Sequence, residues 1–339
     1  MSEKTPILLA ATALLSASGS ALLARYGNSV GIFDVPNQRS SHAIPTPRTG
    51  GIGMFAALAL AALAAWFWSG LRPPPRQEEW LCAVGAAFFL LGLCEDILQL
   101  SEKLRLIIQT LLALTAAFFG PRIASAALPG ASIALAPPAA AALTAFWYVG
   151  FVNIFNFLDG LDGYAAGEAL CAGVFIAALS GSARPLFISA AAAGFLIFNF
   201  KPARLFMGDG GSYFLGFLLA ASCVAGSQES GVPFAAFLLV LGSFIVDSAV
   251  TLAKRIARGE PWMKAHRSHY YQRLTDLGFG HARIALMNMG LTALLGISAL
   301  AYIRGGACFK WLVLIGWAAA FAGLVGLIER AFRIKAAKF

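Results

Sequence analysis

Four short polar clusters interrupt an otherwise apolar chain, and their residue types favour chemistry on an anionic substrate. They combine carboxylates, amides, histidines and arginines, and they lie at Glu95-Asp96, Asn153–Gly163, Asn199–Ser212 and His266–His269. Carboxylates beside a bilayer are costly unless they are paired or used. Carboxylate oxygens suit Mg²⁺, while arginine and histidine suit phosphate groups. The pattern predicts a metal-assisted reaction of a phosphate-bearing substrate.

The composition places these clusters in a polytopic membrane protein. Of the 339 residues 59% are hydrophobic and 12% are charged, about half the charged share of a soluble domain. No polar stretch is long enough for a soluble domain, so we expect one integral membrane domain over residues 1–339. The net charge is +9, but the basic residues form no stripe with interleaved aromatics. This argues against a nucleic-acid partner. The five cysteines form no C-x-x-C pair and predict neither disulfides nor a zinc site.

Apolar runs of roughly 20 residues predict an all-α fold with about eleven transmembrane helices. The expected spans are residues 5–25, 50–70, 80–95, 104–119, 138–156, 164–180, 184–200, 211–227, 233–253, 285–303 and 308–329. Residues 120–137 predict an outside loop or a short hairpin. If the loop after the first span is cytoplasmic, eighteen of the 25 Lys and Arg residues face inward. The positive-inside rule then places the N-terminus outside and the C-terminus in the cytoplasm. All four clusters fall on that cytoplasmic side.

Glu95 and Asp96 end the third predicted span. Adjacent carboxylates on a helix point in different directions, so one can bind a metal or accept a proton while the other pairs with Lys103 or Arg105. An ordinary solvated helix end is the alternative. Two acids at a bilayer edge favour a functional role.

Asn153, Asn156, Asp159 and Asp162 recur every three residues. A helix would place the first three along one slowly drifting stripe, and amides inside an apolar span need a wet cavity or polar partners. Interhelical hydrogen bonding is the alternative, and it explains one asparagine better than four polar residues. A calcium loop is a further alternative, but the spacing does not match an EF-hand.

Three other segments carry candidate ligand-binding residues. Asp209 lies among glycines just before a span, with Asn199 upstream, and there it can approach a metal that also binds phosphate; a capped Gly-rich turn is the alternative. His266, Arg267 and His269 can clamp a diphosphate, against a weak two-histidine zinc site or a solvated loop. The Pro- and Gly-rich loop after the first span offers phosphate donors at Arg39, His42 and Arg48. Asp247 lies within a span, and its role stays open; Lys254 and Arg255 are candidate partners.

In this order, the motifs resemble the polyprenyl-phosphate N-acetylhexosamine-1-phosphate transferase family, over residues 33–275. The resemblance implies a phosphoglycosyltransferase that moves a HexNAc-1-phosphate from a UDP-N-acetylhexosamine, of the UDP-GlcNAc or UDP-FucNAc type, to undecaprenyl phosphate, releasing UMP. It implies Mg²⁺, or Mn²⁺, as cofactor, and a multi-pass enzyme of the bacterial inner membrane that contacts membrane lipids. A homodimer is compatible with it.

The resemblance also implies roles for individual residues. Asp209 corresponds to the metal ligand, and Asn156 is the second expected metal ligand. Glu95 and Asp96 correspond to the paired acids near the reacting phosphates, and Lys103 to a lysine on phosphate. The expected nucleotide- and cation-site residues are Asn153, Asn156, Asp159, Asp162 and Asn199, and the expected diphosphate or sugar contacts are His266, Arg267 and His269.

Two departures from the family pattern carry information. Glu95 stands where an aspartate is usual, which makes Asp96 the stronger candidate for a chemical role. The run His-Arg-Ser-His-Tyr-Tyr-Gln-Arg from His266 is closer to the members that initiate O-antigen synthesis than to the peptidoglycan branch. A cation- or proton-coupled transporter is the alternative function, but it predicts internal repeats and mid-membrane acids. A membrane scaffold would not need clustered acids and amides.

Overall fold

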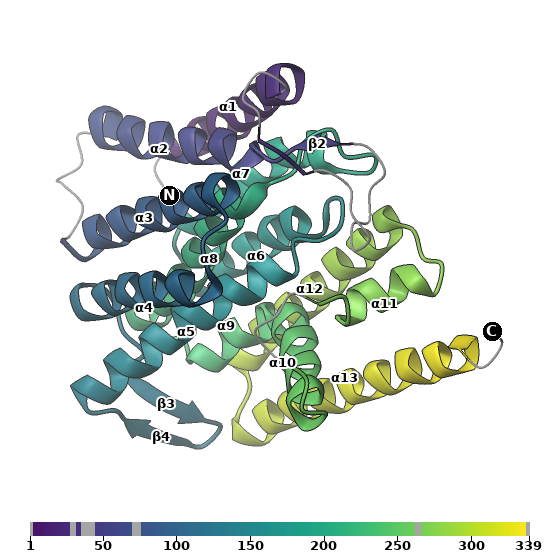
Figure 1. Cartoon of the computed structure of the whole chain (residues 1–339). Coiled ribbons are helices and arrows are strands. Elements are labelled where there is room, and N and C mark those ends of the chain that lie inside the picture. Colours follow the sequence, from purple (N-terminus) through teal and green to yellow (C-terminus); the bar gives the residue numbers. More distant parts are fainter. Residues whose placement is uncertain (1–2, 28–31, 35–44, 70–75, 262–265, 337–339) are drawn as a thin grey trace.

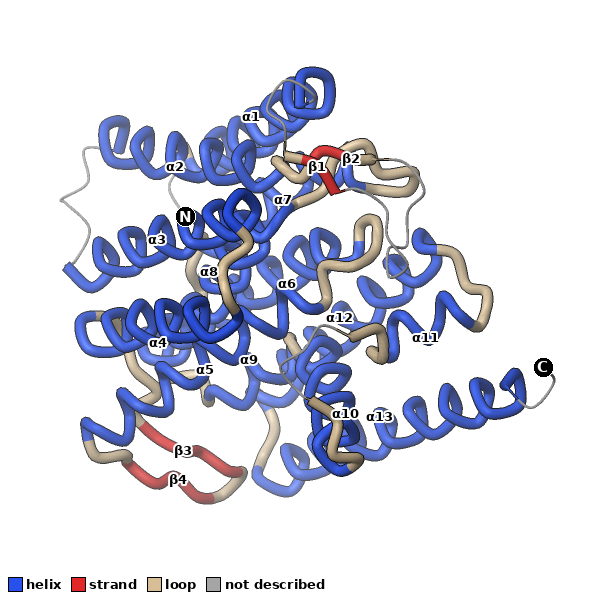
Figure 2. The backbone as a smooth tube through the Cα atoms, in the orientation of Figure 1, coloured by secondary structure: helices blue, strands red, loops and turns tan. Residues whose placement is uncertain are grey.

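The computed structural model describes residues 3–27, 32–34, 45–69, 76–261 and 266–336, and within them the protein is an all-α bundle (Figures 1 and 2). The helices are α1 (Thr5–Tyr26), α2 (Gly50–Ser69), α3 (Arg76–Leu98), α4 (Glu102–Phe119), α5 (Pro137–Phe157), α6 (Tyr164–Ser180), α7 (Arg184–Asn199), α8 (Gly208–Ser230), α9 (Phe234–Val240), α10 (Gly242–Ala257), α11 (Tyr270–Asp276), α12 (His281–Arg304) and α13 (Ala307–Ala336). Two hairpins complete the chain, β1 (Phe33–Asp34) with β2 (Thr46–Pro47) and β3 (Ser125–Leu128) with β4 (Ala131–Ala134). The second confirms the expected hairpin within residues 120–137.

All eleven predicted spans are helical, but the predicted number of transmembrane helices is not confirmed. In the described part of the chain seven helices are long and apolar enough to cross a bilayer, or eight if α9 and α10 count as one span. The other three are α4, whose first turn holds Glu102, Lys103 and Arg105, and the shorter α6 and α7, of 17 and 16 residues. Charge and length therefore separate these three from the rest.

The helix α8 forms the centre of the bundle. Of its apolar window 83% is buried, against 6% for α13. It packs against α3, α5, α6 and α2, and aromatic rings fill the joins: Phe217 stacks on Phe88 at 4.9 Å and meets Tyr148 edge-on at 5.3 Å. Such contacts bury large apolar areas. The helix α8 is therefore held from several sides.

Local residues fix where several helices begin and end. Ser101 caps α4, because its side chain accepts the Leu104 N–H at 3.4 Å. Prolines in the first turns of α5 and α7 preset the helical backbone. Glycines with positive φ flank α6 at both ends, Gly163 at 74° and Gly181 at 69°.

The predicted span over residues 233–253 is helical but is not one straight helix. The chain bends by 81° between α9 and α10, and α10 turns a polar face inward, with Ser243, Asp247 and Thr251 buried. Leu252 and Ile256 face outward and are 39% and 56% exposed. Lipid cannot cover a polar face cheaply, so α10 turns that face onto protein.

A buried carboxyl ties the bent span to its neighbours. Glu168 on α6 has no exposed surface, and one of its oxygens accepts hydrogen bonds from Asn288 Nδ2 at 2.9 Å, Thr292 Oγ1 at 2.5 Å and Ser243 Oγ at 3.5 Å. The donors belong to α12 and to the first turn of α10. This node joins three helices where apolar packing alone would not fix their rotation.

Replacing Glu168 by alanine should destabilise the protein by about 1–3 kcal/mol, because three buried donors would lose their acceptor. Glu168→Gln keeps the size and one acceptor oxygen, and should lose less. Thermal unfolding in detergent measures both. Equal melting temperatures for Glu168→Ala and the native protein would contradict a bracing role.

Candidate active site

The candidate site is built on the first turn of α8. Gly208 has a φ of 75°, which favours glycine, and a Cβ there would overlap the carbonyl of Arg48 and approach Asp96 Oδ2 to 2.8 Å. On the other side, a Cβ on Gly92 of α3 would overlap the carbonyl of Asp209. The missing side chains let α3 and the β2–α2 link approach the backbone that carries Asp209.

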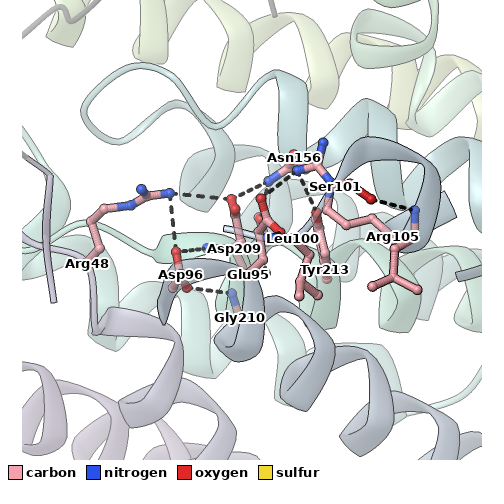
Figure 3. A network of polar contacts seen from close by, with 12 residues as sticks. Arg48, Glu95, Asp96, Leu100, Ser101, Arg105, Asn156, Asp209, Gly210 and Tyr213 are labelled. Carbon is pink, nitrogen blue, oxygen red and sulfur yellow. Dashed lines mark hydrogen bonds and ion pairs between the residues drawn. The ribbon is translucent and has the colours of Figure 1, made fainter. Parts of the chain in front are cut away.

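Asp96 holds this turn in place. Its Oδ1 accepts the backbone N–H of Asp209 and its Oδ2 that of Gly210, each at 3.0 Å, and its side chain is 1% exposed. A carboxylate at the first N–H groups of a helix satisfies donors that lack intrahelical partners. Arg48 Nη2 lies 3.2 Å from Asp96 Oδ1 and 3.5 Å from Asp209 Oδ1 (Figure 3). One guanidinium thus neutralises part of the charge of two acids.

Asn156 brings α5 to the same carboxylate. Its Nδ2 donates to Asp209 Oδ1 at 2.8 Å and to Ser212 Oγ at 2.9 Å. Asp209 is 18% exposed, far more than Asp96. No donor in the described residues reaches its Oδ2, so Asp209 is the carboxylate that can receive a ligand.

Glu95 faces a different neighbour from Asp96, as expected for adjacent helical residues. Its Oε1 pairs with Arg105 Nη1 at 3.0 Å, and its Oε2 accepts the Leu100 N–H at 2.9 Å. Arg105 Nη1 also lies 3.5 Å from the Tyr213 hydroxyl (Figure 3). Of the two predicted basic partners it is Arg105 that pairs. Lys103 is exposed on the first turn of α4.

Asp159 adds a third acid immediately after α5. Burial raises its pKa well above the ordinary value; the negative charges of Asp209 and Asp96 raise it further, and Arg48 lowers it. The three aspartates therefore share one electrostatic environment. No hydrogen bond or ion pair to the Asp159 side chain exists among the residues that the structure describes.

The carboxylates fit a hard divalent cation that takes its remaining ligands from water and substrate. In the described residues no three His, Cys, Asp or Glu side chains form a ready-made metal cage. Mg²⁺ usually binds through one or two carboxylates with waters and substrate phosphates, which agrees with an accessible Asp209 beside Asp159. Asn156 turns its amide nitrogen toward Asp209, so a metal role for Asn156 would require its oxygen to face the ion.

Asp162 and Asn199 brace the loops around the site. Asn199 Oδ1 accepts the Gly163 N–H and its Nδ2 donates to the Leu205 carbonyl, both at 3.0 Å. Asp162 accepts the Ala203 N–H at 3.1 Å and lies 3.5 Å from Lys201 Nζ and 3.2 Å from His281 Nδ1.

Burial acts to raise the pKa of Asp162, but bonds from His281 and Ala203 and the charge of Lys201 outweigh it, so the pKa lies below its ordinary value. Asp162 therefore stays ionised at neutral pH.

Asn153 does not reach the cluster through any contact in the described residues. Its Nδ2 donates to Gln109 Oε1 on α4 at 2.7 Å and to the Val149 carbonyl at 2.8 Å. Asn153 therefore forms an interhelical hydrogen bond, which was the alternative interpretation of the sequence.

The histidine segment forms a second polar cluster around Asp247. His269 Nδ1 lies 2.9 Å from Asp247 Oδ1, and the rings of His266 and His269 stack at 4.9 Å. Burial first, and then His269 and Arg255, lower the pKa of His266 to about 4, although the charge of Asp247 acts to raise it. His266 is therefore neutral at physiological pH. Arg267 pairs with Asp276 at 3.2 Å.

The expected partners of Asp247 were wrong. Lys254 pairs with Glu329 on α13 and Arg255 with Glu260, both at 2.8 Å. All three residues lie on α10, and seven or eight positions separate the acid from the two basic residues, about 11 Å along a helix.

Sequence reasoning missed several site residues. Arg48 was noted as a phosphate donor but not placed between Asp96 and Asp209, and the Gly50-Gly51 pair that follows it was the available signal. Tyr213 and Gln109 gave no signal, because their partners lie far away in the chain. Arg39 and His42 lie outside the described residues.

The fold and the site define a polytopic membrane enzyme whose acids and arginines meet at one end of the bundle. Residues 80–227 match the model of glycosyl transferase family 4. Three relatives are a probable undecaprenyl-phosphate N-acetylglucosaminyl 1-phosphate transferase of Bacillus subtilis, a decaprenyl-phosphate N-acetylglucosaminephosphotransferase of Mycolicibacterium smegmatis and a phospho-N-acetylmuramoyl-pentapeptide-transferase of Deinococcus radiodurans.

The chain is 29% identical to the B. subtilis protein, and the match covers 92% of this chain and 89% of that protein. It is 30% identical to the M. smegmatis protein, over 76% of this chain and 72% of that protein. It is 33% identical to the D. radiodurans protein, over 62% of this chain and 72% of that protein. The chain belongs to the polyprenyl-phosphate N-acetylhexosamine-1-phosphate transferase family, and it is a phosphoglycosyltransferase. The comparisons do not support the alternative of a transporter.

Gly92→Ala should lower both stability and activity, because the added methyl group would push on the carbonyl of Asp209. Overpacking of this kind costs about 1–3 kcal/mol. Gly150→Ala on α5 is the matched control, since its Cβ would meet nothing within 4 Å. Melting temperature and turnover are compared for both variants; equal behaviour of the two would contradict a close contact between α3 and α8.

Proposed function

We propose that this enzyme transfers GlcNAc-1-phosphate from UDP-GlcNAc to undecaprenyl phosphate and releases UMP. This step would initiate a lipid-linked polysaccharide of the cell envelope, O-antigen-like in kind. The observation that carries the proposal is the partly exposed Asp209 carboxylate, held by Asn156 and Arg48 beside Asp96. The B. subtilis and M. smegmatis relatives, which are named for N-acetylglucosamine and a polyprenyl phosphate, support this donor and acceptor.

In the proposed reaction an oxygen of the lipid phosphate attacks the phosphorus next to the sugar, and the bond to UMP breaks. Positioning and charge neutralisation carry most of such a transfer. Arg48 is placed to bind a phosphate beside Asp209. The resemblance assigns Lys103, His266, Arg267 and His269 to the diphosphate or the sugar. Mg²⁺ bound by Asp209, with Asp159 and Asn156 near it, would supply charge stabilisation at the diphosphate.

Asp96 is proposed to position the site rather than to form a bond. Both of its oxygens already accept backbone N–H groups of α8, so attack by Asp96 on phosphorus would release the turn that carries Asp209. This favours direct attack by the lipid phosphate over a covalent phosphosugar intermediate. Glu95 would act through Arg105, and Asn153, Asp162 and Asn199 would hold the surrounding helices and loops.

We propose that the site faces the cytoplasm of a bacterium, with the N-terminus outside and the C-terminus inside. Hydrogen bonds join the start of α8 to α3 and to α5, and Tyr271 of α11 bonds to Phe157 at the end of α5, so these elements share one end of the bundle (Figure 2). With about eleven crossings of the inner membrane, α4, α6 and α7 would be spans that pack within the bundle. Membrane lipids would cover the exposed apolar side chains, and a homodimer would use the same surface.

The purified protein should release UMP from UDP-GlcNAc only when undecaprenyl phosphate and a divalent cation are both present. Asp209→Asn should lower turnover by at least 100-fold and leave the melting temperature nearly unchanged, because the amide keeps the size but removes the charge that a metal needs. Glu102→Gln, at an exposed acid of α4, is the matched control. A panel with UDP-FucNAc and UDP-MurNAc-pentapeptide, with mass analysis of the lipid product, tests the donor. Normal turnover by Asp209→Asn would remove Asp209 from the metal site.

The orientation is testable with single cysteines in a chain that lacks its five native ones. A cysteine at Glu102 should react with an impermeant maleimide only after the membrane is permeabilised, since the proposal places this turn in the cytoplasm. A cysteine at Ser132, in the exposed β4 strand, should react in intact spheroplasts. The reverse labelling pattern would overturn the proposed topology.

A further inference from the structure

We infer that Asp247 is a positioning residue of the transferase, which fixes the tautomer of His269 and holds α11 against the loop that carries Asp159. The inference rests on the proposed function, because it assigns the second polar cluster to the same reaction. Asp247 lies on α10 and is 8% exposed. A carboxylate of this kind within a membrane helix needs partners or a use.

The Asp247 carboxylate meets three donors from the histidine segment. Its Oδ1 lies 2.9 Å from His269 Nδ1 and accepts the Tyr270 N–H at 3.0 Å, while its Oδ2 accepts the Tyr271 N–H at 3.0 Å. Thr251, one turn along α10, also donates to Oδ1 at 3.3 Å. These bonds hold the first residues of α11 to α10, although the two segments lie more than twenty positions apart in the chain.

The contact also bears on which ring nitrogen of His269 carries the hydrogen. An ionised carboxylate only accepts hydrogen bonds, so His269 Nδ1 must carry the hydrogen that faces Asp247. Its Nε2 is then the ring nitrogen left for a ligand. A carboxylate that orients a histidine in this way fixes which nitrogen meets the substrate. His266 stacks on the same ring and is held by Ser268 Oγ at 2.9 Å.

The other face of α11 rests on the aspartate loop. The Tyr271 hydroxyl donates to the Phe157 carbonyl at 3.1 Å, two residues before Asp159. A Cβ on Gly160 would overlap that hydroxyl, so the loop and the tyrosine are in close contact. Tyr271 also stacks on Tyr164 of α6 at 5.0 Å. Asp247 therefore links the broken membrane span to the acids around Asp209 through one short helix.

A second acid, on α13, bonds to α11 and has no contact with His269, so it provides the matched control. Glu329 of α13 accepts hydrogen bonds from the Tyr270 hydroxyl at 2.9 Å and from Arg273 Nη1 at 2.7 Å. Glu329→Gln weakens these contacts to α11 but leaves the Asp247–His269 contact in place. A general loosening of α11 would affect both variants alike, whereas a role through His269 would affect Asp247→Asn alone.

The kinetic test compares Asp247→Asn and Glu329→Gln with the native protein. Asp247→Asn should raise KM for the UDP-sugar at least tenfold and leave KM for undecaprenyl phosphate within about twofold. Asp247→Glu should recover part of the loss, because it restores a carboxylate. Glu329→Gln should keep the native KM for the donor. Equal losses in the two variants, or unchanged donor KM in Asp247→Asn, would overturn the inference.

A second readout does not depend on turnover or on the identity of the substrates. The chain has four histidines, so a protein labelled with ¹⁵N in histidine gives few ring signals, and His269→Gln identifies that of His269. The native spectrum should show His269 protonated at Nδ1, and Asp247→Asn should change this tautomer balance. A native-like His269 signal in Asp247→Asn would overturn the inference even if the enzyme uses another donor. If the expected shift appears but no UDP-sugar is turned over, the proposed function fails and the Asp247–His269 contact stands.

Discussion

The site depends on one buried carboxylate that occupies the start of the central helix. Asp96 accepts the N–H groups of Asp209 and Gly210 from a position that is 1% exposed. These groups would otherwise be unsatisfied at the beginning of α8. Because the burial of a charge is costly, the arrangement needs the nearby Arg48 guanidinium as well as the backbone donors. The same bonds fix the direction of Asp209, so the orientation of the candidate metal ligand follows from how the helix is capped.

The polar residues divide into those that surround this carboxylate and those that hold the helices around it. Asn156 and Arg48 point at Asp209, whereas Asn153, Asn199 and Glu168 bond to other helices and loops. In a bilayer, where apolar packing distinguishes poorly between helix rotations, such bonds give specificity. A membrane enzyme of this kind therefore needs many more polar residues than those that contact substrate, and residue type alone does not separate the two groups.

Helix positions and the meeting of the clusters were predictable, because both follow from local patterns. Apolar runs located most helix ends to within a few residues, the end of α13 and the break between α9 and α10 excepted, and the Lys and Arg distribution placed Glu95-Asp96, Asn156 and Asp209 at one end of the bundle. Individual partners were not predictable. Asn153 and Asn156 share one stripe, yet a helical turn is enough to direct the first to Gln109 and the second to Asp209. Glu168 carries no motif, and its role arises from donors on α10 and α12 that only the tertiary fold assembles. The number of membrane crossings was not predictable either. The helices α4, α6 and α7 are too short or too charged for hydropathy to show whether they cross the bilayer.

The break between α9 and α10 follows from the side chains that come after it. Residues 234–257, as one straight helix, would extend for about 36 Å at 1.5 Å per residue, and most of α10 would then cross the bilayer. Ser243, Asp247, Thr251 and Arg255 recur at intervals of four and form one buried polar face. Hydrocarbon could not satisfy that face, so the segment is stable only where protein donors and acceptors line it. The 81° bend brings the face to α6 at Ser243 and to the histidine segment at Asp247. The polarity that forbids a straight span is thus the same feature that binds the histidines to the membrane domain.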